Sequence, residues 1–214
     1  IQVAEGGVAE IDIELSGAAS SGTLVIGDES ADGYQANVSF TDEDDDGEVT
    51  VEFNTYAAGS SSNGTVVTAA GDDTVTFDNS SDQTTITSLL AQGDYTLSVS
   101  TTSDASTAVD QPQDLGALVI GDRSTDSMNL WTAPGNADLD ADDEDGTTES
   151  DIVSLIEDGV VTEADGTVTS GDLVIHQVSA TGLEGAIEAN GGIGQALDNG
   201  SIMLSIEQTN PVQN

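Results

Sequence analysis

The sequence has 214 residues, of which 41 are Asp or Glu and only one, Arg123, is Lys or Arg, so its formal net charge is −40. Such a chain repels itself in dilute salt, but above about 1 M ionic strength the Debye length falls to roughly 3 Å and screens the repulsion. The composition therefore predicts a protein of an extreme halophile. It excludes binding to nucleic acid or to an anionic membrane surface, since both need a basic patch, and it makes cations the expected small partners.

High charge with low hydrophobicity is also typical of a disordered chain, but the patterning of the apolar residues favours a folded protein. The sequence lacks cysteine, which excludes disulfides and thiolate metal sites. No run approaches 18 consecutive apolar residues, so no membrane insertion is expected within this chain. No signal peptide is recognisable, and we expect a mature or trimmed chain.

Residues 1–105 alternate between apolar and polar side chains in short runs, which is typical of half-buried strands. Turn signals such as Asp32-Gly33 and Asn63-Gly64 separate the runs every eight to twelve residues. Seven or more short strands at this spacing predict an immunoglobulin-like (Ig-like) β-sandwich. The predicted strands are 11–15, 24–26, 34–40, 49–53, 65–69, 74–77, 84–89 and 95–99.

Residues 106–114 are predicted to be a linker, because the region around them is rich in Ser, Thr and Asp and has weak periodicity. A long loop inside a single domain is the alternative. Residues 115–214 are predicted to form a second β domain with one or two short helices inserted. The fold class expected is therefore mainly β, with two tandem β-sandwich (Ig-like) domains.

The second domain is expected to contain four strands, at 118–120, 128–131, 172–178 and 201–207. Thr147 or Thr148 is the predicted cap of a helix that runs to Ile156 and ends at Asp158-Gly159, and a shorter helix is predicted at 183–189. The segment 24–32 also matches 118–126, which favours a duplicated domain start.

Two acidic loops are candidate cation sites, because closely spaced carboxylates supply the hard oxygen ligands that Ca²⁺ prefers, with Mg²⁺ as the alternative. The first has a D-x-D-x-D-G pattern that ends at Gly47, and the second ends at Gly146 in a poorer register. Solvated acidic turns on a halophilic surface are the alternative for both loops. The predicted metal ligands are Asp42, Asp44 and Asp46 in the first loop and Asp138, Asp140 and Asp142 in the second.

Four N-x-[ST] sequons mark candidate N-glycosylation sites, although a chain rich in Asn, Ser and Thr also forms such triplets by chance. Asn63 and Asn79 in polar turns are favoured over Asn199, before a predicted strand, and Asn37, on the outward side of one.

Catalytic motifs are missing from the sequence, and we expect a protein that is not an enzyme. His176 is the only histidine, and its place in an apolar strand favours a structural role. Trp131, the only tryptophan, is interpreted as a core or interface anchor.

Several segments resemble haloarchaeal surface-layer glycoproteins, namely 118–131, 152–161 and 171–185, and 90–99 resembles the late strands of Ig-like surface domains. The resemblance implies export, glycosylation, dependence on divalent cations and lateral assembly into a lattice or fibre. Family members carry several more such modules and a C-terminal anchor, so this chain is either an excised piece or a smaller relative.

We therefore expect an extracellular structural protein of the cell envelope, a self-assembling subunit or fragment of a surface layer or cell-surface filament. Its partners would be copies of itself or lattice neighbours. Recruitment of a neighbour through an exposed strand edge is one hypothesis, with the first strand, which ends at Leu15, as donor. An adhesin, or a spike or fibre protein of a halophilic virus that binds a host surface, is the alternative.

Overall fold

The computed structural model describes residues 1–60, 64–137, 139, 148–164 and 166–205. Within these residues the chain is mainly β, as predicted, and divides into two compact units. Unit 1 consists of residues 1–124 together with residues from Thr181 onward, and unit 2 is the intervening segment, Thr125–Ala180.

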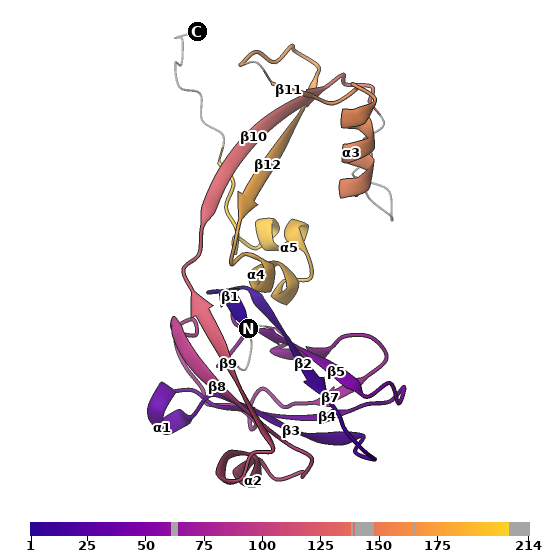
Figure 1. Ribbon diagram of the computed structural model, residues 1–214. Coiled ribbons are helices and arrows are strands. Elements are labelled where there is room, and N and C mark those ends of the chain that lie inside the picture. The colour runs from indigo at the N-terminus through magenta and orange to yellow at the C-terminus, as the bar shows by residue number, and fades with distance from the viewer. Residues whose placement is uncertain (61–63, 138, 140–147, 165, 206–214) are drawn as a thin grey trace. The chain divides into compact units, whose positions relative to one another are not determined.

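Unit 1 contains two sheets (Figure 1). The first has six strands in the order β1-β9-β8-β3-β4-β7, with β1 parallel to β9 and the other pairs antiparallel. The second has three antiparallel strands in the order β2-β5-β6. The strands of the first sheet are β1 (Gln2–Ala4), β3 (Ser21–Ile26), β4 (Ala36–Thr41), β7 (Thr74–Thr76), β8 (Gly93–Ser100) and β9 (Asp114–Gly121). Those of the second are β2 (Val8–Glu14), β5 (Glu48–Asn54) and β6 (Val67–Ala69).

One hydrophobic core joins the two sheets, which is consistent with a β-sandwich. Alternation with period two places every second side chain of these strands on the same face, toward the core. The buried set includes Ile11 and Ile13 of β2, Val38 and Phe40 of β4, Val49, Val51 and Phe53 of β5, and Tyr95 and Leu97 of β8. Tyr34, just before β4, packs edge-on against Tyr95 with 6.5 Å between the ring centroids.

Two short helices of unit 1 were not predicted, α1 (Glu29–Asp32) and α2 (Ala105–Asp110). Each is capped by an aspartate, Asp28 or Asp104, whose carboxylate accepts two backbone N–H groups of the first turn. These capping bonds are local, but four to six residues are too few to show a helical apolar period. The predicted strand at 84–89 is wrong, since that segment has no regular secondary structure.

The compact units differ from the predicted domain boundaries. Residues 106–114 hold most of α2 and the start of β9 rather than a linker, and β9 pairs with β8 along its length. Leu118 and Ile120 of β9 are buried in the core of unit 1, which explains why this strand joins the first sheet. The matching segments 24–32 and 118–126 begin in β3 and β9, the two neighbours of β8, so the second copy does not start a domain.

Unit 2 has a single sheet of three antiparallel strands, in the order β11-β10-β12, and one helix in its described residues. It therefore lacks, within those residues, the second facing sheet that the predicted sandwich requires. Helix α3 confirms its prediction, with Thr148 and Asp151 forming a reciprocal capping box and Asp158 at its end. The elements are β10 (Thr125–Ala133), α3 (Glu149–Glu157), β11 (Thr162–Glu163) and β12 (Leu173–Ala180).

After unit 2 the chain returns to unit 1 and forms α4 (Glu184–Ala189), as predicted, and α5 (Ile193–Asp198), which was not predicted. The predicted strand at 201–207 is absent from its described part, residues 201–205. Of the helices in the described ranges, none has the length and apolar character needed to cross a bilayer.

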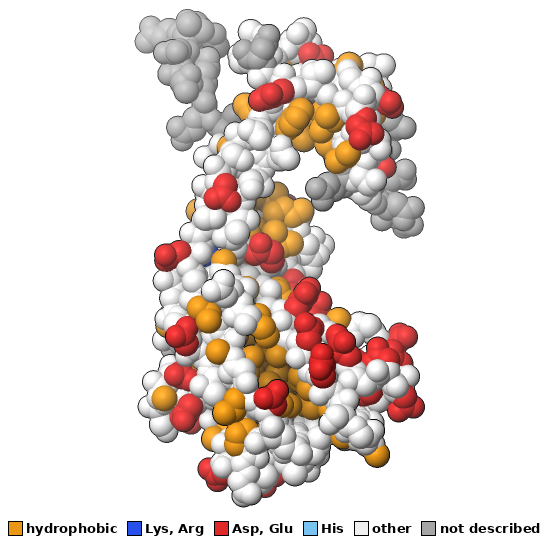
Figure 2. All heavy atoms as spheres, viewed as in Figure 1, with side chains coloured by type: hydrophobic (Ala, Val, Ile, Leu, Met, Phe, Trp, Pro, Cys, Tyr) orange, Lys and Arg blue, Asp and Glu red, His pale blue; other side chains and the backbone are white. Residues whose placement is uncertain are grey.

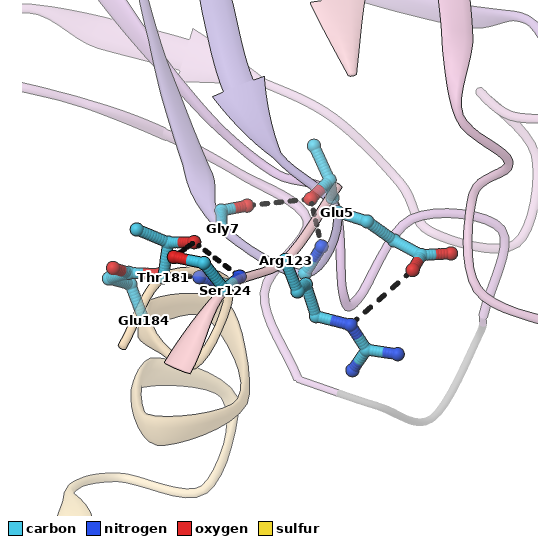
Figure 3. A network of polar contacts seen from close by, with 9 residues as sticks. Glu5, Gly7, Arg123, Ser124, Thr181 and Glu184 are labelled. Carbon is cyan, nitrogen blue, oxygen red and sulfur yellow. Dashed lines mark hydrogen bonds and ion pairs between the residues drawn. The ribbon is translucent and has the colours of Figure 1, made fainter. Parts of the chain in front are cut away.

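The residues at which the chain leaves and re-enters unit 1 are hydrogen-bonded to each other (Figure 3). Ser124 N donates to Thr181 Oγ1 at 2.9 Å, and Thr181 N donates to Ser124 O at 2.9 Å. Next to them, Arg123 forms an ion pair with Glu5, with 3.4 Å between Nε and Oε2. Unit 2 is therefore inserted between two residues that unit 1 already holds together.

Candidate metal centre

The first acidic loop lies where the chain crosses between the two sheets of unit 1. Residues 42–47 connect β4 to β5, and residues 70–73 connect β6 back to β7. Because Thr41 of β4 pairs with Thr74 of β7, the residues beside them, Asp42 and Asp73, are brought to the same edge of the sandwich. Both crossings therefore meet at one end of unit 1.

The acidic loop is held in a tight turn by its own carboxylates. Asp44 Oδ1 accepts from Asp46 N at 3.2 Å, and Asp46 Oδ1 accepts from Glu48 N at 2.8 Å. Asp45 and Gly47 have φ of 59° and 86°, a left-handed conformation that Asp and Gly tolerate better than most residues. This local geometry turns Asp42 and Asp44 toward one another.

Asp42, Asp44 and Asp73 form a cluster in which each offers a carboxylate oxygen, and these oxygens all lie within 4.8 Å of one another. Asp42 is only 5 % exposed. Its Oδ2 accepts from Gly47 N at 3.1 Å, but its Oδ1 is buried and has no hydrogen-bond partner among the residues described. A buried carboxylate oxygen without a partner is costly unless it is hydrogen-bonded or coordinates a cation.

The electrostatics of the cluster also favour a cation. The hydrogen bond from Asp46 N lowers the pKa of Asp44, but desolvation and the negative charges of Asp46, Asp73 and Asp42 outweigh it. The pKa of Asp44 therefore lies above its usual value. A divalent ion in contact with these oxygens would offset the mutual repulsion that causes this shift.

The structure brings together two of the three ligands predicted for this loop. Asp46 lies outside the group, and Asp73 replaces it. Asp73 was missed because it is separated by about thirty residues from the acidic loop, and only the pairing of β4 with β7 makes it a neighbour. The acidic dipeptide Asp72-Asp73 before the predicted strand 74–77 was the available signal. The ligands predicted in the second loop, Asp138, Asp140 and Asp142, lie outside the described residues.

The first comparison with known proteins matches residues 1–102 to a family described as a domain of unknown function, DUF7827. The second finds a cell surface glycoprotein of Haloferax gibbonsii that is 41 % identical over 209 residues, covering 98 % of this chain and 22 % of the relative. Cell surface glycoproteins 1 and 2 of Haloarcula hispanica are 32 % and 33 % identical over 96 % and 88 % of this chain, or 22 % and 20 % of their own lengths.

The chain is a homologue of haloarchaeal cell surface glycoproteins. The predicted resemblance is thus confirmed, and the names of the relatives support the expected extracellular, cell-surface location. The chain spans about a fifth of the length of these curated relatives. No solved structure matches it.

The asparagine side chains of the described sequons differ in the hydrogen bonds that they form. Asn79 Nδ2 donates to Gly64 O at 2.8 Å, and Asn199 Nδ2 donates to Asn190 Oδ1 at 2.5 Å. Asn37 is half-buried on β4, and its Oδ1 accepts from Gln35 Nε2 at 2.9 Å. Because an amide nitrogen has two hydrogens, each of these bonds leaves at least one hydrogen on Nδ2 that an N-linked sugar could replace. Asn63 lies outside the described residues.

Unit 2 contains the single histidine and the single tryptophan, both on its sheet. His176 of β12 pairs with Leu130 of β10, and its Nδ1 is buried without a hydrogen-bond partner in the described part of the chain. Trp131 Nε1 donates to Gln177 Oε1 at 3.0 Å.

Proposed function

We propose that the chain is a non-enzymatic structural module of a haloarchaeal surface layer or cell-surface filament, whose fold is stabilised by a divalent cation. The relationship to cell surface glycoproteins supports the structural role. The buried Oδ1 of Asp42, which has no hydrogen-bond partner among the described residues, is the observation that carries the cation. Asp42 belongs to a cluster whose other members, Asp44 and Asp73, come from both crossings between the sheets.

The proposed ion would fasten the sandwich at one end. Asp42 and Asp44 belong to the β4–β5 crossing and Asp73 to the β6–β7 crossing, so an ion that binds all three links two loops that are distant in sequence. A ligand that binds the folded state and not the unfolded chain stabilises the fold in proportion to RT ln(1 + [L]/Kd). The module would then be most rigid when both salt and the divalent ion are present.

Ca²⁺ fits the cluster better than Mg²⁺. Ca²⁺ accepts six to eight oxygen ligands in flexible geometry, whereas Mg²⁺ demands near-ideal octahedral geometry and retains several waters. Three carboxylates on two turns, one of them exposed, form a flexible set that backbone carbonyls or water would complete. We therefore propose Ca²⁺ as the preferred ion.

The decisive experiment is thermal unfolding, followed by circular dichroism, at constant high NaCl with either Ca²⁺ or a chelator. We expect the Tm to fall on chelation, and we expect this difference to disappear in Asp42→Asn and Asp73→Asn. Asp46→Asn is the matched control, because its side chain lies in the same loop outside the cluster and its Oδ1 can still accept from Glu48 N. A wild-type Tm that is independent of Ca²⁺ would reject the site. So would a control variant Asp46→Asn in which the Tm difference between Ca²⁺ and chelator disappears as it does in Asp42→Asn.

Assembly and glycosylation are proposed from the relationship to cell surface glycoproteins. Light scattering in high NaCl, with Ca²⁺ added or removed, tests whether the chain forms larger particles. Mass spectrometry of the chain expressed in a haloarchaeon tests glycans at Asn37, Asn63, Asn79 and Asn199. A monodisperse chain without sugars in both experiments would contradict the proposed role in an envelope layer.

A further inference from the structure

Asn37 of β4 has an amide nitrogen that is free to carry a sugar. The residues before and after it are buried in the core, so the alternation of the strand places the Asn37 side chain on the outer face of its sheet. Its Oδ1 accepts from Gln35 Nε2 at 2.9 Å, whereas its Nδ2 has no hydrogen-bond partner among the described residues. The Nδ2 atoms of Asn79 and Asn199 both donate hydrogen bonds. Of the three described sequons, Asn37 therefore leaves free the nitrogen that glycosylation modifies.

A hollow of about 410 Å³, here called the Asn37 hollow, opens beside this side chain. Its volume falls within the roughly 300–1,000 Å³ that is usual for small-molecule sites. Acidic side chains are spread over the surface of unit 1 that is visible in Figure 2, whereas the lining of the Asn37 hollow includes a single acid, Glu29. Every side chain of the lining is polar, and besides Asn37 the lining residues are Glu29, Gln35, Ser81, Gln83, Thr84 and Thr85.

The walls of the Asn37 hollow are held in place by hydrogen bonds between β4 and the segment 82–84. Asn37 N donates to Asp82 O at 2.8 Å. Thr84 N donates to Gln35 O at 2.9 Å, and Gln35 N donates to Thr84 Oγ1 at 3.2 Å. Because these bonds form within the protein itself, a sugar that enters the hollow does not have to order its walls.

Three groups in the lining are available to bond sugar hydroxyls. The carboxylate of Glu29, the Oε1 of Gln35 and the hydroxyl of Thr85 form no hydrogen bond with another described residue. The amide of Gln83, in contrast, already bonds four protein groups. Sugar hydroxyls both donate and accept, which matches a carboxylate, an amide oxygen and a hydroxyl. A uronic acid or a sulfated sugar would place a second negative charge beside Glu29, so the lining favours a neutral sugar.

We infer that Asn37 is a glycosylated sequon and that its first sugar, a neutral pyranose, lies in the Asn37 hollow. Ser39 supplies the hydroxyl of the sequon. The transfer uses a lipid-linked glycosyl phosphate as donor and a glycosyltransferase of the cell. Asn37 Nδ2 forms a bond to the anomeric carbon and loses a proton to solvent, while the bond from that carbon to the phosphate oxygen breaks and the lipid phosphate leaves. This inference rests on the proposed glycosylation and selects one site.

A sugar in the Asn37 hollow would connect three parts of unit 1. Glu29 lies in α1, Gln35 immediately precedes β4, and Thr85 lies in the segment 81–85. That segment has no regular secondary structure beyond one isolated bridge to β4. Hydrogen bonds to the sugar would therefore add to the few that hold the segment on the sheet, and the glycosylated chain would be the more stable one.

Attachment is tested by mass spectrometry of the peptide that contains Asn37, from the chain expressed in a haloarchaeon. We expect a neutral sugar on Asn37 that is lost in Ser39→Ala and retained in Ser39→Thr, which keeps the hydroxyl of the sequon. An unmodified or acid-linked Asn37 in a chain whose Asn79 or Asn199 carries sugar would overturn the inference and leave the proposed glycosylation standing. A chain without sugar at any sequon would reject both.

The position of the sugar is tested by thermal melts of Thr85→Val in two backgrounds, the glycosylated chain and Ser39→Ala. We expect Thr85→Val to lower the Tm of the glycosylated chain by roughly 2–4 °C, because it removes a hydrogen bond to the sugar. In Ser39→Ala the same substitution should leave the Tm nearly unchanged. Thr87→Val is the matched control, since Thr87 is an exposed threonine outside the lining of the hollow. Equal shifts for Thr85→Val in both backgrounds would overturn the inference. Neither measurement varies Ca²⁺, so the cation site is tested separately.

Discussion

At the scale of single residues, buried polar groups hold unit 1 together where three segments meet. Thr55 is fully buried, and its Oγ1 accepts from Gly6 N at 3.0 Å and donates to Gly7 O at 2.7 Å. Asn54 Nδ2 donates to Gly185 O at 3.0 Å, which binds the start of α4 to the same place. The β1–β2 corner, the end of β5 and α4 therefore share one hydrogen-bonded junction.

Thr55→Val is expected to lower the free energy of unfolding by about 1–3 kcal/mol, because it keeps the shape but leaves Gly6 N buried without its partner. Urea unfolding at constant NaCl measures this, since guanidinium chloride would itself change the ionic strength. Thr55→Ser retains the hydroxyl and is expected to stay closer to wild type. A wild-type midpoint for Thr55→Val would show that the hydroxyl bonds add nothing.

Glu188 gives a prediction about pH. Desolvation and the charge of Glu52 raise its pKa, although the bond from Asn54 lowers it. Because the folded-state pKa is raised, the carboxylate destabilises the fold at neutral pH, and this cost disappears as the pH falls through that pKa. Glu188→Gln should therefore stabilise the fold at pH 7, by about 0.5 kcal/mol or less because the exposed side chain is screened.

The measurement for Glu188 is the difference in Tm between variant and wild type from about pH 7 to pH 4. The gain should shrink as the pH is lowered and as salt is raised. A gain that is constant with pH would mean that the charge of Glu188 is not its cause.

At the scale of elements, the strand pair β2–β5 brings like charges opposite each other. Glu10 lies directly opposite Glu52, and Glu14 lies directly opposite Glu48, in the register of the two strands. Like charges in such cross-strand positions are destabilising. We therefore expect salt to stabilise this strand pair in particular, in addition to screening the total charge.

Glu10→Lys is expected to raise the Tm at moderate ionic strength, because it converts the pair with Glu52 from repulsive to attractive, a change of roughly 1 kcal/mol. The gain should vanish at molar NaCl, where the interaction is screened. Thermal melts over a salt series measure both effects, and Glu10→Gln should give an intermediate gain. A gain that persists in molar salt would point to packing instead of charge.

At the scale of the whole molecule, unit 2 is an insertion between Ser124 and Thr181, which are hydrogen-bonded to each other on unit 1. Replacing Thr125–Ala180 with a two-residue Asn-Gly turn should therefore leave unit 1 folded. Circular dichroism and a cooperative melt near that of the parent chain would confirm this. An unfolded product would show that unit 1 depends on unit 2.

The stability of this shortened protein can be compared with that of a chain of residues 1–102, the span matched by the family model. It lacks β9, whose Leu118 and Ile120 are buried in the core, and loss of such residues costs about 2–5 kcal/mol each. We expect this shorter chain to be unfolded or much less stable under the same conditions. If the chain of residues 1–102 were as stable as the chain that lacks only unit 2, β9 would be dispensable.

Local patterns alone determined the mainly β class, most strands, α3 and the relationship to cell surface glycoproteins. Alternation of apolar residues and the Thr148 cap are properties of neighbouring residues, and so the sequence displays them directly. Tertiary structure decided the rest. Only the pairing of β4 with β7 brings Asp73 to Asp42, and only the burial of Leu118 and Ile120 assigns β9 to the first sheet. These contacts join residues far apart in the chain, and the choice among possible pairings depends on the core that all the strands bury together.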